Sequence, residues 1–317
     1  MNIVFNFSKR GGKFVQSAAM LATLSAVVAA AGVTGCSAAS SEPGHVSVVA
    51  STSVWANVAQ QVAGRLDGSK VSIKAIISSP TADPHAYEVN PRDELAIKRA
   101  DVIIENGGGY DDFMGTMRSA AGADGTLLDA VRISGKQPVD GELNEHVWYD
   151  VATVSHVATR IADVLAAKDR SDASTFRANA RAFATKLHAL QQRELVLRGR
   201  YAGEGVAITE PVPLYLLSAC GLVNRTPEAF SSAIEGEQDV AVRVLRQTEQ
   251  LFSGHAVRLL VYNAQTTGAP TGQIVDAARA AGIPAVPVTE TLPAGLDYLA
   301  WMTKNLDAVA GALGGAS

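Results

Sequence analysis

From Val46 onward, the chain alternates short apolar runs with stretches in which apolar residues recur every three or four positions. In the first half, the apolar runs that predict strands are Val46–Ala50, Val71–Ile77 and Asp101–Glu105. In the second half they are Val206–Thr209, Val257–Tyr262 and Ala285–Thr289. Strands that alternate with helical patterns are typical of α/β units built around a mostly parallel sheet. The pattern therefore predicts two sets of α/β units.

Helices are predicted between these strands from the spacing of their apolar residues. Trp55, Val58, Val62 and Leu66 recur at helical spacing behind a Ser-Thr-Ser start signal. Further helical stretches are Pro91–Ala100, Val240–Phe252 and Gln273–Ala281.

A segment of a different kind joins the two sets. Residues Asp172 to Arg198 contain no Gly or Pro, and their apolar residues form one stripe at spacings of three, four and seven. A helix of this length spans about 40 Å at 1.5 Å per residue. We expect one stiff helix that connects two lobes and restricts hinge motion between them.

The first residues have the pattern of an export signal. Met1–Lys13 is basic without any acidic residue, and an apolar, Ala-rich run extends from Phe14 to about Val33. A transmembrane anchor is the alternative, since the run is almost long enough to cross a bilayer. The run ends in Val33-Thr34-Gly35-Cys36, which resembles the bacterial lipobox, in which the cysteine receives the lipid. We expect a signal peptide over 1–35, lipidation of Cys36, and a flexible tether over 36–44.

Charge and cysteine content narrow the choice of partners. The formal net charge is −4, and loss of the three basic residues of the leader would take it to about −7. The chain then has no basic patch, which argues against nucleic acid as a partner. Cys36 and Cys220 are the two cysteines, so a lipidated Cys36 leaves no internal disulfide. Cys220 lies in an apolar run and is expected to be a buried small hydrophobe.

Six histidines are the starting point for a metal site, because imidazole and carboxylate groups bind zinc and manganese. Four have ordinary explanations as surface or helix residues: His45, His156, His188 and His255. His85 lies in a loop after a predicted strand, and His146 lies directly before a predicted helix. Both have an acidic or amide neighbour that can accept the second ring N–H and so fix the ring.

These residues resemble those of a known family. Asp83-Pro84-His85 with Tyr87-Glu88, followed by Glu145-His146-Val147-Trp148, is similar to the first-lobe signature of the zinc/manganese solute-binding proteins of ABC importers. The stretch from Asn106 to Met114 resembles the strand and turn between these motifs. The stretch from Tyr298 to Asn305 resembles the closing helix of the family. The resemblance covers nearly the whole chain after the tether, in order.

The resemblance implies an α/β fold with two Rossmann-like lobes of mostly parallel sheet, bridged by one long helix. The N-terminal lobe is then expected over 45–170, the linker helix over 171–199 and the C-terminal lobe over 200–317. The metal site would lie in the cleft between the lobes, with His85 and His146 from the first lobe. The second lobe would supply Glu210, in Ile208-Thr209-Glu210, and Glu290, in Pro287-Val-Thr-Glu290.

The position of the two glutamates supports this assignment independently. Glu210 and Glu290 each follow a predicted strand at its carboxyl end, where open α/β sheets place their ligands. Two imidazoles and two carboxylates can hold zinc tetrahedrally, or manganese or ferrous iron with bidentate oxygens. Glu210 stands where zinc-uptake members have a third histidine, and Glu290 stands where manganese members usually have Asp. The prediction favours zinc slightly, with manganese as the alternative.

The leading hypothesis is a receptor without catalytic activity, since four protein donors leave little room for an activated water. It would be a monomer, anchored by lipid to the extracytoplasmic face of a bacterial membrane, that delivers zinc or manganese to an ABC permease and its ATPase. One alternative is a metal-dependent surface adhesin. Another is a metallohydrolase with Glu88 or Glu145 as general base, although the chain lacks a His-Glu-x-x-His helix.

Overall fold

The computed structural model describes residues 45–82, 84, 87–138, 143–266 and 268–314. Its first sheet is parallel and four-stranded, in the order β2-β1-β3-β4. The strands are β1 (Val46–Thr52), β2 (Val71–Ile77), β3 (Val102–Glu105) and β4 (Thr126–Asp129). β1 and β3 are almost entirely buried, which explains their near-continuous apolar sequence.

The second sheet repeats this arrangement in the order β6-β5-β7-β8, again with parallel neighbours. Its strands are β5 (Gly205–Ile208), β6 (Val223–Asn224), β7 (Leu259–Asn263) and β8 (Ala285–Val288). In each sheet the winding reverses beside the first strand, between β1 and β3 and between β5 and β7. Ligands of open α/β sheets bind outside the carboxyl ends of the strands at this point.

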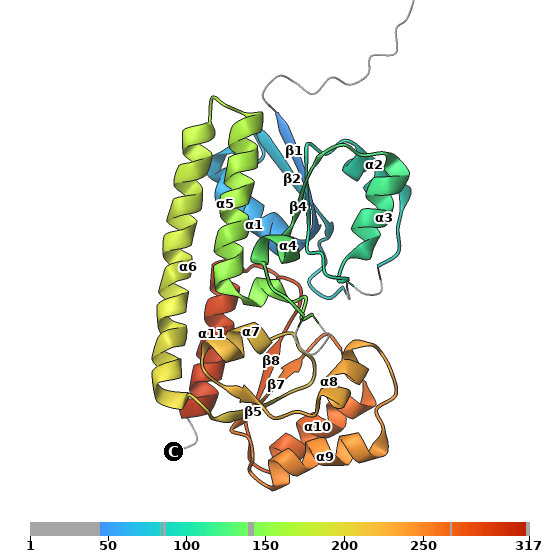
Figure 1. Ribbon diagram of the computed structural model, residues 1–317, viewed down its shortest axis with the longest axis vertical. Coiled ribbons are helices and arrows are strands. Elements are labelled where there is room, and N and C mark those ends of the chain that lie inside the picture. The colour runs from blue at the N-terminus through green and yellow to red at the C-terminus, as the bar shows by residue number, and fades with distance from the viewer. Residues whose placement is uncertain (1–44, 83, 85–86, 139–142, 267, 315–317) are drawn as a thin grey trace, which may run out of the picture. The chain divides into compact units, whose positions relative to one another are not determined.

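Helices cover both sheets (Figure 1). Those that accompany the first sheet are α1 (Ser53–Ala63), α2 (Pro91–Lys98), α3 (Asp112–Ala121), α4 (Ala130–Ser134) and α5 (Val151–Lys168), with 3-10 turns at Gly64–Leu66 and Val147–Tyr149. Those that accompany the second are α7 (Leu214–Ala219), α8 (Glu228–Glu235), α9 (Val242–Ser253), α10 (Ala269–Ala280) and α11 (Tyr298–Gly314). Local chemistry fixes some of the helix starts. The side chain of Asn90, for example, accepts hydrogen bonds from the backbone N–H of Arg92 and Asp93 at the start of α2.

The predicted connecting helix is α6, which spans Ala173–Tyr201 and has 29 residues. It runs beside α5 at one end and beside α11 at the other, so it passes along both lobes (Figure 1). Its apolar stripe is buried along its length, at Phe176, Ala180, Phe183, Leu187, Leu190 and Leu197. The sequence prediction of one long helix is therefore confirmed, with ends that differ by one to three residues.

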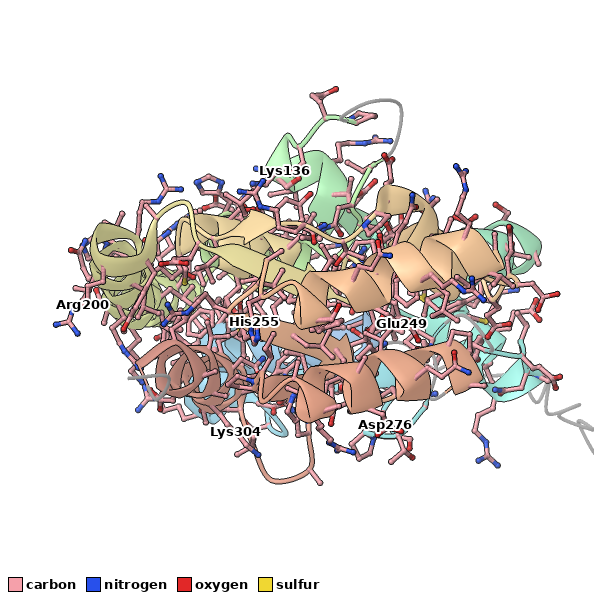
Figure 2. The ribbon with its side chains drawn as sticks, turned by 90° about the horizontal axis from the view of Figure 1, so that it is seen from below. Lys136, Arg200, Glu249, His255, Asp276 and Lys304 are labelled. Carbon is pink, nitrogen blue, oxygen red and sulfur yellow. The ribbon has the colours of Figure 1, made fainter. Side chains whose placement is uncertain are left out.

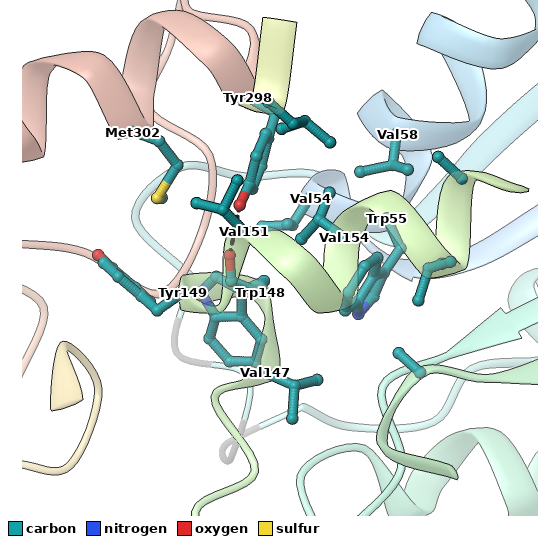
Figure 3. Close-up of a cluster of buried hydrophobic side chains, with 14 of the residues drawn as sticks. Val54, Trp55, Val58, Val147, Trp148, Tyr149, Val151, Val154, Tyr298 and Met302 are labelled. Carbon is teal, nitrogen blue, oxygen red and sulfur yellow. Dashed lines mark hydrogen bonds between the residues drawn. The ribbon is translucent and has the colours of Figure 1, made fainter. Parts of the chain in front are cut away.

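One core cluster joins the two halves of the chain (Figure 3). Trp148 and Tyr298 are both fully buried, and the hydroxyl of Tyr298 donates to the main-chain oxygen of Trp148 at 2.6 Å. The rings of Tyr298 and Trp301 at the start of α11 pack edge to face. Because Trp148 lies two residues after His146, the C-terminal helix helps to fix the segment that carries this histidine.

The fold class predicted from the sequence is confirmed, while two strands were not predicted. β4 is a four-residue strand with a mixed sequence, and β6 is a two-residue edge strand, so neither leaves a periodic signal. Among the described residues, no helix is both long and apolar enough to cross a bilayer. The predicted signal peptide, Cys36 and the tether up to residue 44 lie outside the described residues.

Candidate metal centre

Glu210 and Glu290 both lie directly beyond the carboxyl ends of strands of the second sheet. Glu210 follows β5 and Glu290 follows β8, each after one intervening threonine. Their exposed fractions are 3% and 4%. A buried carboxylate needs hydrogen-bond donors or a cation to offset the loss of hydration.

Glu290 receives donors from both lobes. Nδ2 of Asn263, the last residue of β7, donates to Oε1 at 2.6 Å. The hydroxyl of Tyr110, from the first lobe, donates to Oε2 at 3.2 Å. The backbone N–H of Glu290 donates to the side-chain oxygen of Gln265 at 2.6 Å. The carboxylate is thus fixed at the junction of the two lobes.

The hydroxyl of Tyr110 keeps its proton and so donates a hydrogen bond at this junction of the two lobes. Burial, reinforced by the charge of Glu290 and its hydrogen bond, raises the pKa of Tyr110 well above its ordinary value. Asp111 and Glu235 contribute in the same direction. The Tyr110 ring also lies 5.9 Å from the His146 ring, centroid to centroid, at an interplanar angle of 69°. Tyr110 therefore has Glu290 at its hydroxyl and the His146 ring beside its own ring.

The tautomer of His146 follows from its neighbour Asn144. Nδ2 of Asn144 donates to the main-chain oxygen of Pro211 at 3.0 Å, and that oxygen can only accept, so the amide orientation is fixed. Oδ1 of Asn144 accordingly faces His146, 3.0 Å from its backbone nitrogen and 2.8 Å from Nδ1. Since Oδ1 is an acceptor, Nδ1 carries the proton. The neutral ring then presents the lone pair of Nε2, as a metal ligand must.

The segment before His146 is held by the end of β3. Nδ2 of Asn106 donates to the main-chain oxygen of Glu145 at 2.9 Å, and Nε1 of Trp55 donates to Oδ1 of Asn106 at 3.2 Å. Asn106 directly follows β3, and Asn263 is the last residue of β7. These two strands occupy equivalent places in the two sheets. Each lobe therefore uses an asparagine at the same strand end to position a predicted ligand or its segment.

His85 lies outside the described residues, although the loop before it is described. Nε2 of Gln265 lies 3.3 Å from the main-chain oxygen of Pro80 and 3.2 Å from that of Ala82. The hydroxyl of Thr291 also donates to the Pro80 oxygen at 3.1 Å. The loop that leads to His85 is thus bound to Thr291, which follows Glu290, and to Gln265, which accepts a hydrogen bond from the backbone N–H of Glu290.

Glu235 is a residue of this centre that the sequence analysis missed. It is the last residue of α8, and its Oε1 lies 3.3 Å from Nε2 of His146. Ligand atoms of Glu145, His146 and Glu235 all lie within 4.8 Å of one another. A glutamate at the end of an amphipathic helix is usually solvated, so the sequence position of Glu235 does not indicate a role at a metal centre. The one signal is that Glu235 adjoins Phe230 and Ile234, the buried face of α8.

Residues 48–312 match the model of a protein family described as zinc-uptake complex component A, periplasmic. The chain belongs to this family. Its members are substrate-binding proteins, so the prediction of a binding protein rather than an enzyme is confirmed.

Among curated relatives, the metal ABC transporter substrate-binding lipoprotein SsaB of Streptococcus sanguinis is 30% identical over 168 residues. This match covers 49% of the chain and 52% of the relative, about half the length of each. The iron-binding protein YfeA of Yersinia pestis is 23% identical over 233 residues, 72% of each chain. Among solved structures, the substrate-binding protein FpvC of Pseudomonas aeruginosa, in complex with Mn²⁺, superposes with a TM-score of 0.70. Its identity is 20%, and the superposition covers 86% of this chain and 100% of FpvC, which shows a shared fold.

The remaining histidines and Cys220 lie where the sequence predicted. His156, His188 and His255 are exposed, and His255 follows α9 at the surface of the second lobe (Figure 2). Cys220 is free and fully buried, and burial raises the pKa of its thiol to about 12. A thiol with this pKa stays protonated near neutral pH and does not act as a metal ligand there.

Proposed function

We propose that this protein captures a divalent transition-metal ion between its lobes and delivers it to the permease of an ABC importer. The observation that carries this proposal is that His146 contacts Glu235 and lies beside Tyr110, whose hydroxyl donates to Glu290, so that elements of both lobes meet there. Membership of the family and the metal-transport names of its relatives support the transport role.

We propose His85, His146, Glu210 and Glu290 as metal ligands. His146 offers the lone pair of Nε2, and both glutamates are buried beside strand ends. For His85, the support is its sequence motif together with the binding of Pro80 and Ala82 near Glu290. Two carboxylates neutralise a dication, which lowers the cost of burying it.

The domain division and the membrane anchor are also proposals. Residues 1–35 would be a signal peptide, Cys36 the lipidated residue and 36–44 a tether. The N-terminal lobe would occupy 45–170, the linker helix 171–199 and the C-terminal lobe 200–317. SsaB is a lipoprotein by name, which supports an extracytoplasmic, lipid-anchored location for this chain. We propose a monomer whose partners are the permease and, through it, the ATPase.

For the cargo we propose zinc or manganese. The family is described by zinc uptake, YfeA by iron binding, and the FpvC structure contains Mn²⁺. Two imidazoles and two carboxylates suit each of these ions, since the carboxylates can bind through one oxygen or two. An adhesin role, the alternative weighed from the sequence, would leave this buried and preoriented set of side chains without a purpose.

The test is metal content and competitive affinity of the purified chain for Zn²⁺ and Mn²⁺, compared with Glu210→Ala. We expect one ion per chain and a loss of affinity of about 100-fold or more in the variant, because ligand supports alone are worth 10- to 100-fold. Glu204→Ala, directly before β5 and with its side chain 43% exposed, is the matched control and should bind as the wild type does. A wild-type chain without stoichiometric metal would disprove the proposal.

A further inference from the structure

The contact between Glu235 and His146 joins the two lobes at the candidate metal centre. Glu235 ends α8 of the second lobe, and His146 precedes the Val147–Tyr149 turn of the first. The separation of Oε1 and Nε2 is 3.3 Å. The His146 side chain is fully buried, the Glu235 side chain is 17% exposed, and Nε2 and both Glu235 oxygens are removed from solvent.

The chemistry of this contact suits a bound metal ion. Because Asn144 fixes the proton of His146 on Nδ1, the neutral ring turns a lone pair toward a carboxylate oxygen that also carries lone pairs. A proton on Nε2 makes this contact an ion pair in the metal-free chain, and a metal ion can take the place of that proton between the two atoms. Metal–nitrogen and metal–oxygen bonds of about 2.0 to 2.2 Å place neighbouring ligand atoms roughly 2.8 to 3.6 Å apart, for angles between about 90° and 109°. The observed separation falls within this range.

The position of Glu235 at the end of α8 also favours a bound cation. The carboxyl end of a helix carries a partial negative charge, which disfavours a carboxylate there. α8 has no basic residue in its last turn. A divalent ion beside Glu235 would stabilise a carboxylate at this helix end.

We propose that Glu235 is a fifth metal ligand, which adds a third carboxylate to the centre. This inference rests on the proposed function, because it concerns the same ion. Two nitrogens and at least three oxygens form a site for ions that accept five or six ligands and prefer carboxylate oxygen. Manganese and ferrous iron meet this description better than zinc, which most often takes four ligands. Glu235 would therefore shift selectivity away from zinc.

Glu145 is the other acidic side chain of the cluster, and the geometry favours Glu235 over it. The ligand atom of Glu145 lies within 4.8 Å of the other two, while Glu235 is in direct contact with Nε2. Glu145 also belongs to the same lobe as His146. A ligand from α8 instead couples the metal to the second lobe, so that loading would tie α8 to the first lobe.

The experiment compares the wild type, Glu235→Gln and Glu237→Gln, each loaded with Mn²⁺ and with Zn²⁺. Glu237 is an exposed neighbour beyond α8, and its variant has the same loss of charge. The first readout is X-ray absorption at the metal edge, which counts ligands. We expect five or six nitrogen and oxygen ligands around Mn²⁺ in the wild type and one carboxylate fewer in Glu235→Gln. The second readout is affinity, which should fall about tenfold or more for Mn²⁺ and less for Zn²⁺ in that variant only.

The outcomes separate the two proposals. A wild type that binds no metal would overturn the proposed function and this inference with it. A wild type that binds Mn²⁺ through four ligands, or a Glu235→Gln variant with an unchanged ligand count, would overturn the fifth ligand alone. An affinity loss without a change in ligand count would mean that Glu235 acts through His146, which also contradicts the proposal. The X-ray absorption spectrum of the wild type gives the number of ligands, so it tests the fifth ligand even if Glu235→Gln fails to fold.

Discussion

Oδ1 of Asn144 lies 2.8 Å from Nδ1 of His146, and the same side chain donates through Nδ2 to the main-chain oxygen of Pro211. One amide thus fixes the tautomer of a candidate ligand in the first lobe and contacts the residue after Glu210 in the second. Orientation of a histidine ligand through its other nitrogen is a general feature of metal sites. Here that orientation is coupled to the contact between lobes.

Replacement of Asn144 by Ala should lower metal affinity by about 10- to 100-fold, since His146 loses the partner that fixes its ring. Asn144→Asp keeps an oxygen for Nδ1 and should recover part of the loss. Tyr215→Phe is the control, because Tyr215 donates to the main-chain oxygen of Asn144 and leaves the amide intact. Competition titration measures all three, and equal affinities for Asn144→Ala and Tyr215→Phe would contradict the role of the amide.

Tyr110→Phe should weaken metal binding by roughly tenfold, because Glu290 loses the donor that orients its second oxygen. The ring contact with Trp148, 4.7 Å between centroids, would remain, so the metal-free melting temperature should change little. Tyr87→Phe removes a hydroxyl that donates to Asp93, in α2, and serves as the control. A Tyr110→Phe variant with wild-type affinity and a lower melting temperature would make the hydroxyl a purely structural group.

Glu194 should make the stability of the chain depend on pH. Burial, and then the charge of Asp150, raises the pKa of this carboxyl from 4.5 to about 7 in the folded protein. The folded state therefore holds this proton where the unfolded state has lost it, so the free energy of unfolding falls as pH rises from about 4.5 to 7. Glu194→Gln removes this loss and should stabilise the chain by about 1 to 3 kcal/mol at pH 8, with little gain at pH 4.5.

Urea unfolding at both pH values checks this prediction in the metal-free chain. Glu249→Gln, on α9, is the control for the same change of a glutamate to glutamine elsewhere in the chain. A gain for Glu194→Gln that is the same at both pH values would mean that the side-chain shape, rather than its ionisation, determines stability.

Metal loading should change the dimensions of the chain very little. α6 passes along both lobes, and hydrogen bonds such as Tyr298 to Trp148 and Tyr149 to Thr289 join residues of the first lobe to the second. Solution scattering of metal-free and loaded protein should give radii of gyration that agree within error. A clear decrease on loading, as expected for hinge closure, would show that α6 does not restrict the lobes.

Much of the fold was open to prediction because its signals are local. The apolar stripe of α6 is recognisable by its periodicity, and the apolar runs of β1 and β2 by their β-branched content. β6 escaped because two residues are too few to show a period, and β4 escaped because its Thr-Leu-Leu-Asp sequence lacks the Val and Ile of the predicted strands.

The residues of the candidate site likewise differ in whether the sequence predicts them. Glu210 and Glu290 were predicted from the family resemblance, and their place directly after predicted strands supported that prediction. Glu235 as the neighbour of His146, and Tyr110 as the donor to Glu290, depend on contacts between residues far apart in the chain. Pairings across two lobes leave no pattern in a single sequence, so only the folded arrangement reveals them. The neighbour of His146 was expected to accept its N–H, and the contact with Asn144 confirms this.

The most direct test of the central claim is an anomalous difference map from crystals of the chain grown with Mn²⁺ or Zn²⁺. The account predicts one strong peak between the lobes, within bonding distance of His85, His146, Glu210 and Glu290. A peak elsewhere, or these four side chains apart from one another and directed to solvent in a metal-loaded crystal, would contradict it.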